Sequence, residues 1–328
     1  MGQPTSISRR QAIGGLAACG LSSLPAFAQG PGNYPNQVIR IVVPYPAGGA
    51  TDTLARMMAS HLQTAWGQTV IVENKPGASG AIGNDMVAKA APDGYTVLMA
   101  ITAIVQIPPL MPNLPYNVMT DLQPLAQVAN TNSLLAVPKA APFKDLKDFV
   151  AEVKAHPRKY DYGSYGVGTS SHIQGSLLNM QAGLDLVHVP YKGAAPLLQD
   201  LRGNQLTAAF IDMATARPHL DAMRALAVTG TRRNPVLPDV PTFAELGYHS
   251  FEPVGWFGLF MPSKVPAPIA QKFADESNRI LRLPEVVQRI EALGMTAGGM
   301  PTADFAKVVR DDAGVYAKII KDANIRLE

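Results

Sequence analysis

The chain has 328 residues, of which 47% are hydrophobic and 16% are charged, a balance typical of folded globular proteins. Its length exceeds what one common domain needs, so we expect two lobes. The formal net charge is +3, and without Arg9 and Arg10, which lie in a predicted export signal, 26 basic residues stand against 25 acidic ones. This near-neutral balance gives no electrostatic reason to expect binding of nucleic acid or of a membrane surface.

Residues 1–28 resemble a cleaved export signal. Arg9-Arg10 form a basic start, residues 12–24 are mostly apolar, and Ala26-Phe27-Ala28 fits a cleavage site. The apolar stretch is too short and too rich in Gly and Ser to span a bilayer. Twin-arginine export and lipid anchoring at Cys19, which lies in a lipobox-like segment, are the alternatives. Cys19 is the only cysteine, so a chain cleaved after residue 28 has no disulfide and no thiolate metal site.

Short β-branched runs then alternate with helical patterns. Residues 38–43 are typical of a buried strand, and a helix follows with Thr51 or Asp52 as its cap. Two further strands are expected at 70–72 and 96–100, with a helix between them that ends near residue 91. This βαβαβ pattern predicts a parallel sheet with right-handed crossovers.

The pattern restarts after Asn130. Strands are predicted at 134–137, 186–189, 206–211 and 226–229, and helices at 145–155, 170–182 and 194–202. An apolar strand at 256–261 and a mostly helical end from Pro268 complete the chain. Since no flexible linker separates the lobes, we expect two crossings, near Asn130 and Ser250. The predicted fold is α/β with one lobe of residues 29–130 plus 250–328 and another of residues 131–249, each a mainly parallel sheet flanked by helices, with a hinged cleft between them.

The turn at residues 44–52 is the first candidate for ligand binding. A buried parallel strand delivers it to the carboxyl edge of the sheet, where open α/β folds bind ligands. Gly48 and Gly49 let the backbone approach a ligand, and the following helix offers unpaired N–H groups that suit a carboxylate. An ordinary βα turn whose glycines serve its geometry is the alternative.

The second candidate is the segment 162–172, in which three glycines and several hydroxyl residues precede a helix. Ser170 or Ser171 as a simple N-cap would explain one hydroxyl but not the others, so ligand contact is favoured.

A third strand-to-helix turn spans residues 189–196. Here Tyr191 or backbone N–H groups are better ligand contacts than Lys192, since lysine at such a turn is usually solvated.

Signals of catalysis are weak by comparison. The sequence lacks a G-x-S-x-G elbow, a P-loop and a dinucleotide fingerprint, and its six histidines show no metal-ligand spacing. We therefore expect no cofactor, no metal and no enzymatic activity. His172 with Ser170 or Ser171 imitates a Ser–His pair, but neighbours on one helix point to different faces.

The segments named so far, in this order, resemble the Bug-type (TctC-like) receptors of tripartite tricarboxylate transporters. The similarity runs from about Tyr34 to the C-terminal helix. Its motifs are Val43-Pro44-Tyr45-Pro46-Ala47-Gly48-Gly49-Ala50-Thr51-Asp52, Val72-Glu73-Asn74-Lys75-Pro76-Gly77-Ala78, Pro92-Asp93-Gly94-Tyr95-Thr96, the Gly-Ser-rich segment ending at His172, Val189-Pro190-Tyr191-Lys192-Gly193, Leu226-Ala227-Val228-Thr229 and Leu237-Pro238-Asp239-Val240-Pro241-Thr242.

The resemblance implies a periplasmic binding protein of the type II-like, two-lobed kind, which closes on a small carboxylate and presents it to membrane transporter subunits. A monomer is expected. The carboxylate would lie against the loop from Tyr45 to Thr51, with walls from the segments around Thr169 and Tyr191. The expected ligand-binding residues are Tyr45, Ala47, Gly48, Gly49, Thr51, Thr102, Ser164, Thr169, Ser170, Ser171, Tyr191, Gly193 and Asp212.

One segment departs from the family pattern. After the third strand many relatives carry a Ser-Thr-His-Ala-like stretch, whereas this chain has apolar residues around Thr102 and no histidine. The replacement is compatible with a less polar or aromatic acid. Asp212 lies where relatives contact the distal part of the ligand, and it either binds an amino group or caps the following helix.

Two other functions compete with capture for transport. A ligand sensor that docks on a signalling protein would use the same cleft, so the sequence does not separate it from a transport receptor. An α/β hydrolase would need a nucleophile–base pair, which the sequence does not provide.

Overall fold

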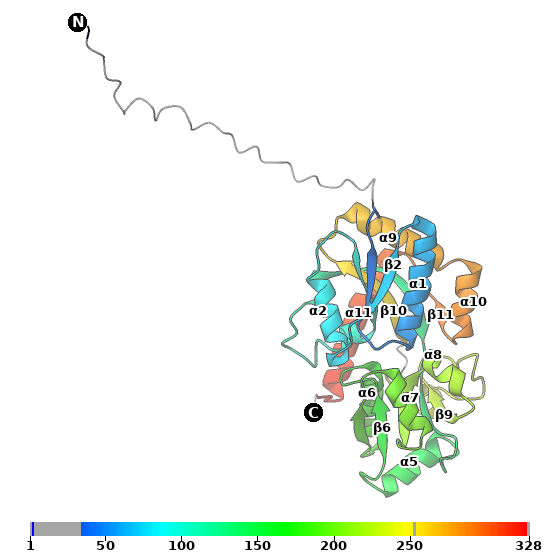
Figure 1. Ribbon diagram of the computed structural model, residues 1–328. Coiled ribbons are helices and arrows are strands. Elements are labelled where there is room, and N and C mark those ends of the chain that lie inside the picture. Colours follow the sequence, from blue (N-terminus) through cyan, green and yellow to red (C-terminus); the bar gives the residue numbers. More distant parts are fainter. Residues whose placement is uncertain (1, 3–33, 252–253, 327–328) are drawn as a thin grey trace. The chain divides into compact units, whose positions relative to one another are not determined.

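The computed structural model describes Gly2, residues 34–251 and residues 254–326. Apart from Gly2, the predicted signal peptide of residues 1–28, with its cleavage site and Cys19, lies outside these residues. From Tyr34 onward the chain forms one unit that contains two β-sheets with helices packed on them (Figure 1). In the described part of the chain, no helix combines the length and apolar character needed to cross a bilayer.

The first sheet has six strands in the order β11-β4-β10-β3-β1-β2. β1 pairs in parallel with β2 and β3, whereas β10, β4 and β11 join through antiparallel pairs. The strand bounds are β1 Ile39–Val43, β2 Val70–Asn74, β3 Thr96–Ile101, β4 Leu122–Thr131, β10 Gly255–Pro262 and β11 Thr296–Ala297.

The second sheet has five strands in the order β7-β6-β8-β5-β9. β6 pairs in parallel with β7 and β8, while β5 is antiparallel to both β8 and β9. The strand bounds are β5 Ser133–Pro138, β6 Asp161–Ser164, β7 Val187–Pro190, β8 Ala208–Asp212 and β9 Met223–Val228.

The α/β class with two flanked sheets is confirmed, but the sheets are mixed rather than mainly parallel. The predicted βαβαβ unit is present as β1, β2 and β3. The antiparallel pairs come from strands that reach their sheet from distant parts of the chain, such as β10, which lies between β3 and β4. Their pairing is a tertiary property that local periodicity does not report.

Helices cover the sheets, and their bounds follow the apolar pattern. Those of the first sheet are α1 Ala50–Trp66, α2 Ala81–Ala88, α3 Ala103–Gln106, α4 Val118–Asp121, α9 Ala267–Ile280, α10 Pro284–Ala292 and α11 Thr302–Asp322. Those of the second sheet are α5 Leu146–Ala155, α6 Ser170–Ala182, α7 Ala194–Arg202 and α8 Met213–Ala216. The short 3₁₀ turns are η2 Ala78–Gly80, η3 Arg217–His219 and η4 Ala244–Leu246.

Strand β1 shows why this part of the chain is apolar on both faces. Ile39, Ile41 and Val43 are fully buried in one hydrophobic cluster, and Val42 is fully buried in another. A strand covered by helices on both sides has no polar alternation. Helix α1 buries Leu54, Met58 and other residues of one face in the first of these clusters and ends at Gly67, whose φ of 63° is the left-handed conformation that glycine supplies at helix ends.

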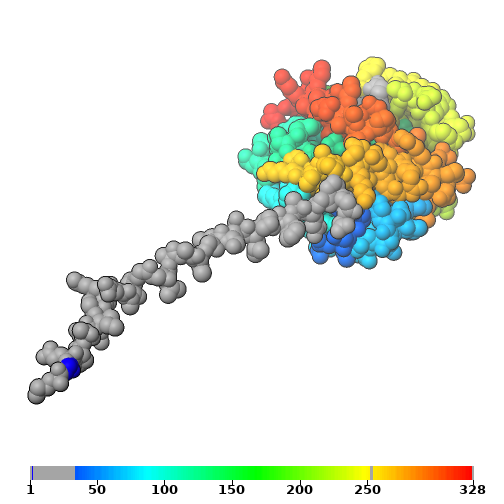
Figure 2. Space-filling model, turned by 90° about the horizontal axis from the view of Figure 1, so that it is seen from above, coloured from blue at the N-terminus to red at the C-terminus, as the bar shows by residue number. Residues whose placement is uncertain are grey.

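The chain passes from the first sheet to the second at Asn132 and returns between β9 and β10. The two passages contact each other, since the Asn132 side-chain amide donates to the Thr229 carbonyl over 2.6 Å. In the space-filling view the orange residues lie beside the blue residues that begin the described chain (Figure 2), in agreement with the packing of α9 on α1. The last quarter of the chain therefore completes the first sheet and its layers.

Candidate ligand-binding site

A cavity lies where strand-to-helix turns of both sheets meet. Its volume is about 80 Å³, and since one ordered water needs roughly 10–15 Å³, it holds several water-sized groups. The lining residues are Tyr45, Pro46, Ala47, Gly49, Ala50, Thr51, Ile101, Thr102, Thr131, Ser133, Tyr165, Thr169, Ser170, Ser171, Gly193, Ala194, Ala195, Phe210, Asp212, Thr215, Gly255, Trp256 and Phe257. A cavity with apolar walls and a few convergent polar groups is typical of a small-molecule site.

The β1–α1 turn contributes one wall and a helix N-terminus. Gly49 is the N-cap of α1 in extended conformation, and no side chain caps the helix, so the predicted cap from Thr51 or Asp52 is wrong. Thr53 makes the first backbone bond of the helix, to the Gly49 carbonyl over 3.0 Å. The N–H groups that precede it have no acceptor within the helix and are available to an anion.

The β6–α6 turn contributes hydroxyls and a second helix N-terminus. Thr169, not Ser170 or Ser171, is the N-cap of α6, and its hydroxyl donates to the Gly166 carbonyl over 2.7 Å. The Ser171 hydroxyl accepts the Tyr165 N–H at 3.0 Å. These bonds fix the turn and leave the first N–H groups of α6 without a side-chain cap.

The β7–α7 turn contributes a third helix N-terminus through Gly193, the N-cap of α7. Its φ of 113° is strongly disfavoured for any residue with a side chain, so the glycine is required by the turn. Tyr191 does not line the cavity. Its hydroxyl donates to the Asp200 carboxylate over 2.7 Å, and burial together with this bond raises the pKa of Tyr191 to about 12.

Asp212 at the end of β8 lines the cavity next to the β6–α6 turn. One of its oxygens accepts the Thr215 N–H at 2.9 Å, so it caps α8, which was one of the two predicted roles. The other oxygen accepts from the Tyr165 hydroxyl at 2.7 Å and from the Thr215 hydroxyl at 2.8 Å. The carboxylate is thus well satisfied by the protein while still forming part of the cavity surface.

Ten of the predicted site residues line this one cavity: Tyr45, Ala47, Gly49, Thr51, Thr102, Thr169, Ser170, Ser171, Gly193 and Asp212. Gly48, Ser164 and Tyr191 do not. Ser164 is fully buried, with its hydroxyl 2.7 Å from Nε2 of His188, so it stabilises the β6–α6 turn without reaching the cavity. Gly48 lines a neighbouring groove that shares Gly49 and Ala194 with the cavity.

Several lining residues carried no local signal in the sequence. Trp256 and Phe257 begin β10 and supply aromatic surface, and Thr131 lies at the end of β4 next to the crossing between the sheets. The Trp256 N–H hydrogen-bonds to the Thr102 hydroxyl over 2.7 Å, although the two residues are 154 positions apart. Only the pairing of β10 with β3 brings them together.

The electrostatics of the cavity are unusual for an anion site. Among the described residues that line it, Asp212 alone is charged, and none is Lys or Arg. A carboxylate here would therefore be held by backbone N–H groups, hydroxyls and the partial positive charge of the helix ends. The negative Asp212 would repel a second carboxylate placed next to it and attract a hydrogen-bond donor.

The histidine next to the hydroxyl cluster is used structurally. Nδ1 of His172 accepts the Gly168 N–H at 3.1 Å, and the ring stacks on that of His188 with the centroids 4.3 Å apart. The Ser171 hydroxyl is bonded to the Tyr165 N–H and to Thr169. These contacts thus engage His172 and Ser171 with the turn rather than with each other as a base and its nucleophile.

Residues 54–325 match the family model described as the tripartite tricarboxylate transporter family receptor. Three solved structures are similar along nearly their whole length. The periplasmic binding protein BugD is 31% identical, with 90% of this chain and 100% of that chain covered and a TM-score of 0.85. A protein of R. palustris with adipate is 30% identical, with 89% and 99% covered and a TM-score of 0.85. MatC from Rhodopseudomonas palustris with bound malate is 31% identical, with 88% and 100% covered and a TM-score of 0.83.

Proposed function

The chain belongs to the tripartite tricarboxylate transporter receptor family, and from this premise we propose that it captures one small carboxylate in the cavity and delivers it to a tripartite tricarboxylate-type membrane transporter. The observation that carries the proposal is the convergence of the N-termini of α1, α6 and α7 on one cavity, each without a side-chain cap. Convergent N–H donors suit a carboxylate and leave it chemically unchanged.

The chemical class of the ligand is proposed from the cavity walls and the neighbours. Two similar proteins hold adipate and malate in their structures, which supports a dicarboxylate or tricarboxylate. The aromatic surface of Phe210, Trp256 and Phe257, with Ile101 beside it, supports an aromatic acid instead. Both classes share one carboxylate at the helix ends and differ in the rest of the molecule, where the negative Asp212 would disfavour a second carboxylate placed beside it.

Periplasmic solute binding is the role of the family and of its structural neighbours. We propose that the chain is exported by a signal peptide cleaved after residue 28 and acts as a monomer. Its lobes would be residues 29–130 plus 250–328 and residues 131–249, moving about the passages at Asn132 and between β9 and β10. Closure around the acid would present one conformation to the transporter.

Thermal unfolding against a panel of acids tests this function. We expect one acid among adipate, malate, citrate, benzoate and glutamate to raise the melting temperature of the mature chain by a few degrees, because ligand at 100 times its Kd stabilises by about 2.7 kcal/mol. The acid should be recovered unchanged after incubation. If no acid shifts the melting temperature, even after unfolding and refolding to remove co-purified ligand, carboxylate capture is wrong.

A further inference from the structure

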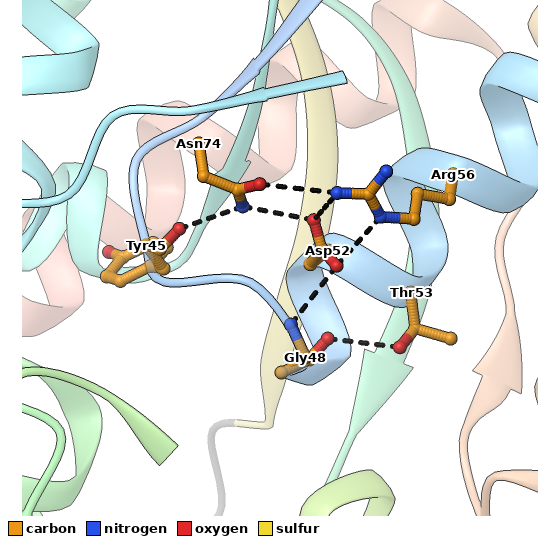
Figure 3. A network of polar contacts seen from close by, with 7 residues as sticks. Tyr45, Gly48, Asp52, Thr53, Arg56 and Asn74 are labelled. Carbon is orange, nitrogen blue, oxygen red and sulfur yellow. Dashed lines mark hydrogen bonds and ion pairs between the residues drawn. The ribbon is translucent and has the colours of Figure 1, made fainter. Parts of the chain in front are cut away.

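A polar network centred on the buried Asp52 carboxylate holds the ligand-facing turn from outside the cavity (Figure 3). We call it the Asp52 network: the side chains of Asp52, Arg56 and Asn74 with the backbone of Tyr45 and Gly48. Asp52 is only 5% exposed. Its carboxylate accepts bonds from the Gly48 N–H at 3.1 Å, Arg56 Nε at 2.9 Å, Arg56 Nη2 at 3.0 Å and Asn74 Nδ2 at 3.0 Å.

Asn74 joins the network to the start of the turn. It is the last residue of β2, and its Nδ2 donates both to the Tyr45 carbonyl and to Asp52 Oδ1, each over 3.0 Å. Its Oδ1 accepts from Arg56 Nη2 at 3.3 Å. One amide thus connects a strand end, the turn and helix α1, so the position of each depends on the others.

The network holds the turn at two points that flank Pro46 and Ala47. Asn74 fixes the carbonyl of Tyr45, and Asp52 fixes the N–H of Gly48. Between these points Pro46 and Ala47 line the cavity, and Gly49 begins the helix whose N–H groups face it. Asp52, Arg56 and Asn74 themselves do not line the cavity.

The negative charge on Asp52 strengthens the hydrogen bonds of the network. Burial alone would raise the pKa of this carboxyl, but the hydrogen bonds from Arg56, Gly48 and Asn74 outweigh burial and hold its pKa below the usual value. The carboxylate is therefore ionised at neutral pH, and its bonds are charge-assisted. It also lies in the first turn of α1, where a negative charge is favoured by the helix dipole.

We propose that Asn74 and Asp52 are positioning residues, which set the affinity for the carboxylate by holding the β1–α1 turn in its binding geometry without touching the ligand. The inference rests on the proposed function, because it concerns the same cavity. A turn already fixed in the ligand-free protein loses less entropy on binding, which increases affinity. Without the network the ligand itself would have to order the turn.

The test compares Asn74→Ala and Asp52→Asn with the wild-type protein. Amide hydrogen exchange is measured at residues 47–52 without ligand, and the Kd for adipate, malate and benzoate is measured by calorimetry well below every melting temperature. We expect faster exchange and a Kd about tenfold weaker in both variants. Glu73→Gln is the matched control: it changes the neighbouring residue of β2, whose side chain pairs with Arg40 and Lys75 outside the network.

The outcomes separate positioning from a merely structural role. Variants that melt at a lower temperature but keep the wild-type exchange rates and Kd would overturn the inference, since the network would then stabilise the fold alone. If the wild-type protein binds none of the acids, the proposed function fails instead, and unchanged exchange at residues 47–52 would still overturn the positioning role. Agreement of Glu73→Gln with the wild type supports an effect specific to the network.

Discussion

Replacing Ala194 by tryptophan is expected to abolish acid binding. Ala194 is the first residue of α7 and lines the cavity. A Cβ placed on Gly49, at the start of α1, would lie 4.0 Å from the Cβ of Ala194. The two helix ends therefore approach closely through small residues, and an indole at this position occupies the space of the ligand. We expect the Kd to weaken by about 100-fold or more, which corresponds to about 2.8 kcal/mol, because the ligand loses the space in which it contacts the helix ends.

Calorimetric titration and ligand-induced thermal shifts measure this effect. Ala194 is partly exposed at the start of its helix, so the ligand-free variant should unfold within a few degrees of the wild type. Lys147→Trp is the control, because it adds the same side chain to an exposed position of α5 that lines none of the described cavities and should bind normally. Binding of the acid by Ala194→Trp with the wild-type Kd would show that the acid does not occupy this cavity.

The second large effect is a loss of stability between about pH 6.5 and pH 4. His172 lies in the first turn of α6, and His188 lies in β7. Burial lowers the pKa of each to about 4, and the neighbouring His172 ring lowers the pKa of His188 further. Below pH 6.5 the unfolded chain takes up protons that the folded chain does not, so the free energy of unfolding falls as the pH falls. For His172, which is 5% exposed, the loss is about 3 kcal/mol by pH 4, since one pKa unit is worth about 1.4 kcal/mol.

Melting temperatures of wild type and His172→Asn across pH 4 to 8 check this prediction. Asparagine offers the Gly168 N–H an acceptor in place of Nδ1 but does not titrate, so the variant's pH profile should be flatter. Both histidines line a surface groove together with the charged residues Arg158, Asp185 and Arg326, which are unchanged in the variant. His249→Asn, which removes an exposed histidine, should keep the wild-type slope. Equal slopes for wild type and His172→Asn would contradict the assignment.

The sequence determined the elements whose apolar pattern is local. Helices α6 and α7 have the predicted bounds, 170–182 and 194–202, because each shows its apolar stripe between a glycine-containing turn and a helix end. The βαβαβ unit of β1, β2 and β3 was predicted for the same reason. The family was predicted from motifs that lie in these turns, and the matching family model confirms it.

Strand β4 shows where local reasoning fails. Residues 122–131 contain Pro124 and two glutamines, and no strand was predicted there. They form a strand because β10, more than a hundred residues later, pairs with them in antiparallel register. β-structure depends on the partner strand more than on intrinsic preference. The same long-range pairing makes the sheets mixed instead of mainly parallel.

For the site, the sequence determined which turns supply helix ends and hydroxyls, because glycines and hydroxyl residues before a helix are local signals. The tertiary structure decided which side chains reach the cavity. The Tyr191 hydroxyl hydrogen-bonds to Asp200 instead of lining the cavity, and Asp52 pairs with Arg56 instead of capping its helix. Trp256, from the distant strand β10, forms part of the cavity wall. Each of these choices depends on a partner that folding places nearby, and buried polar groups take the partners that satisfy their hydrogen bonds.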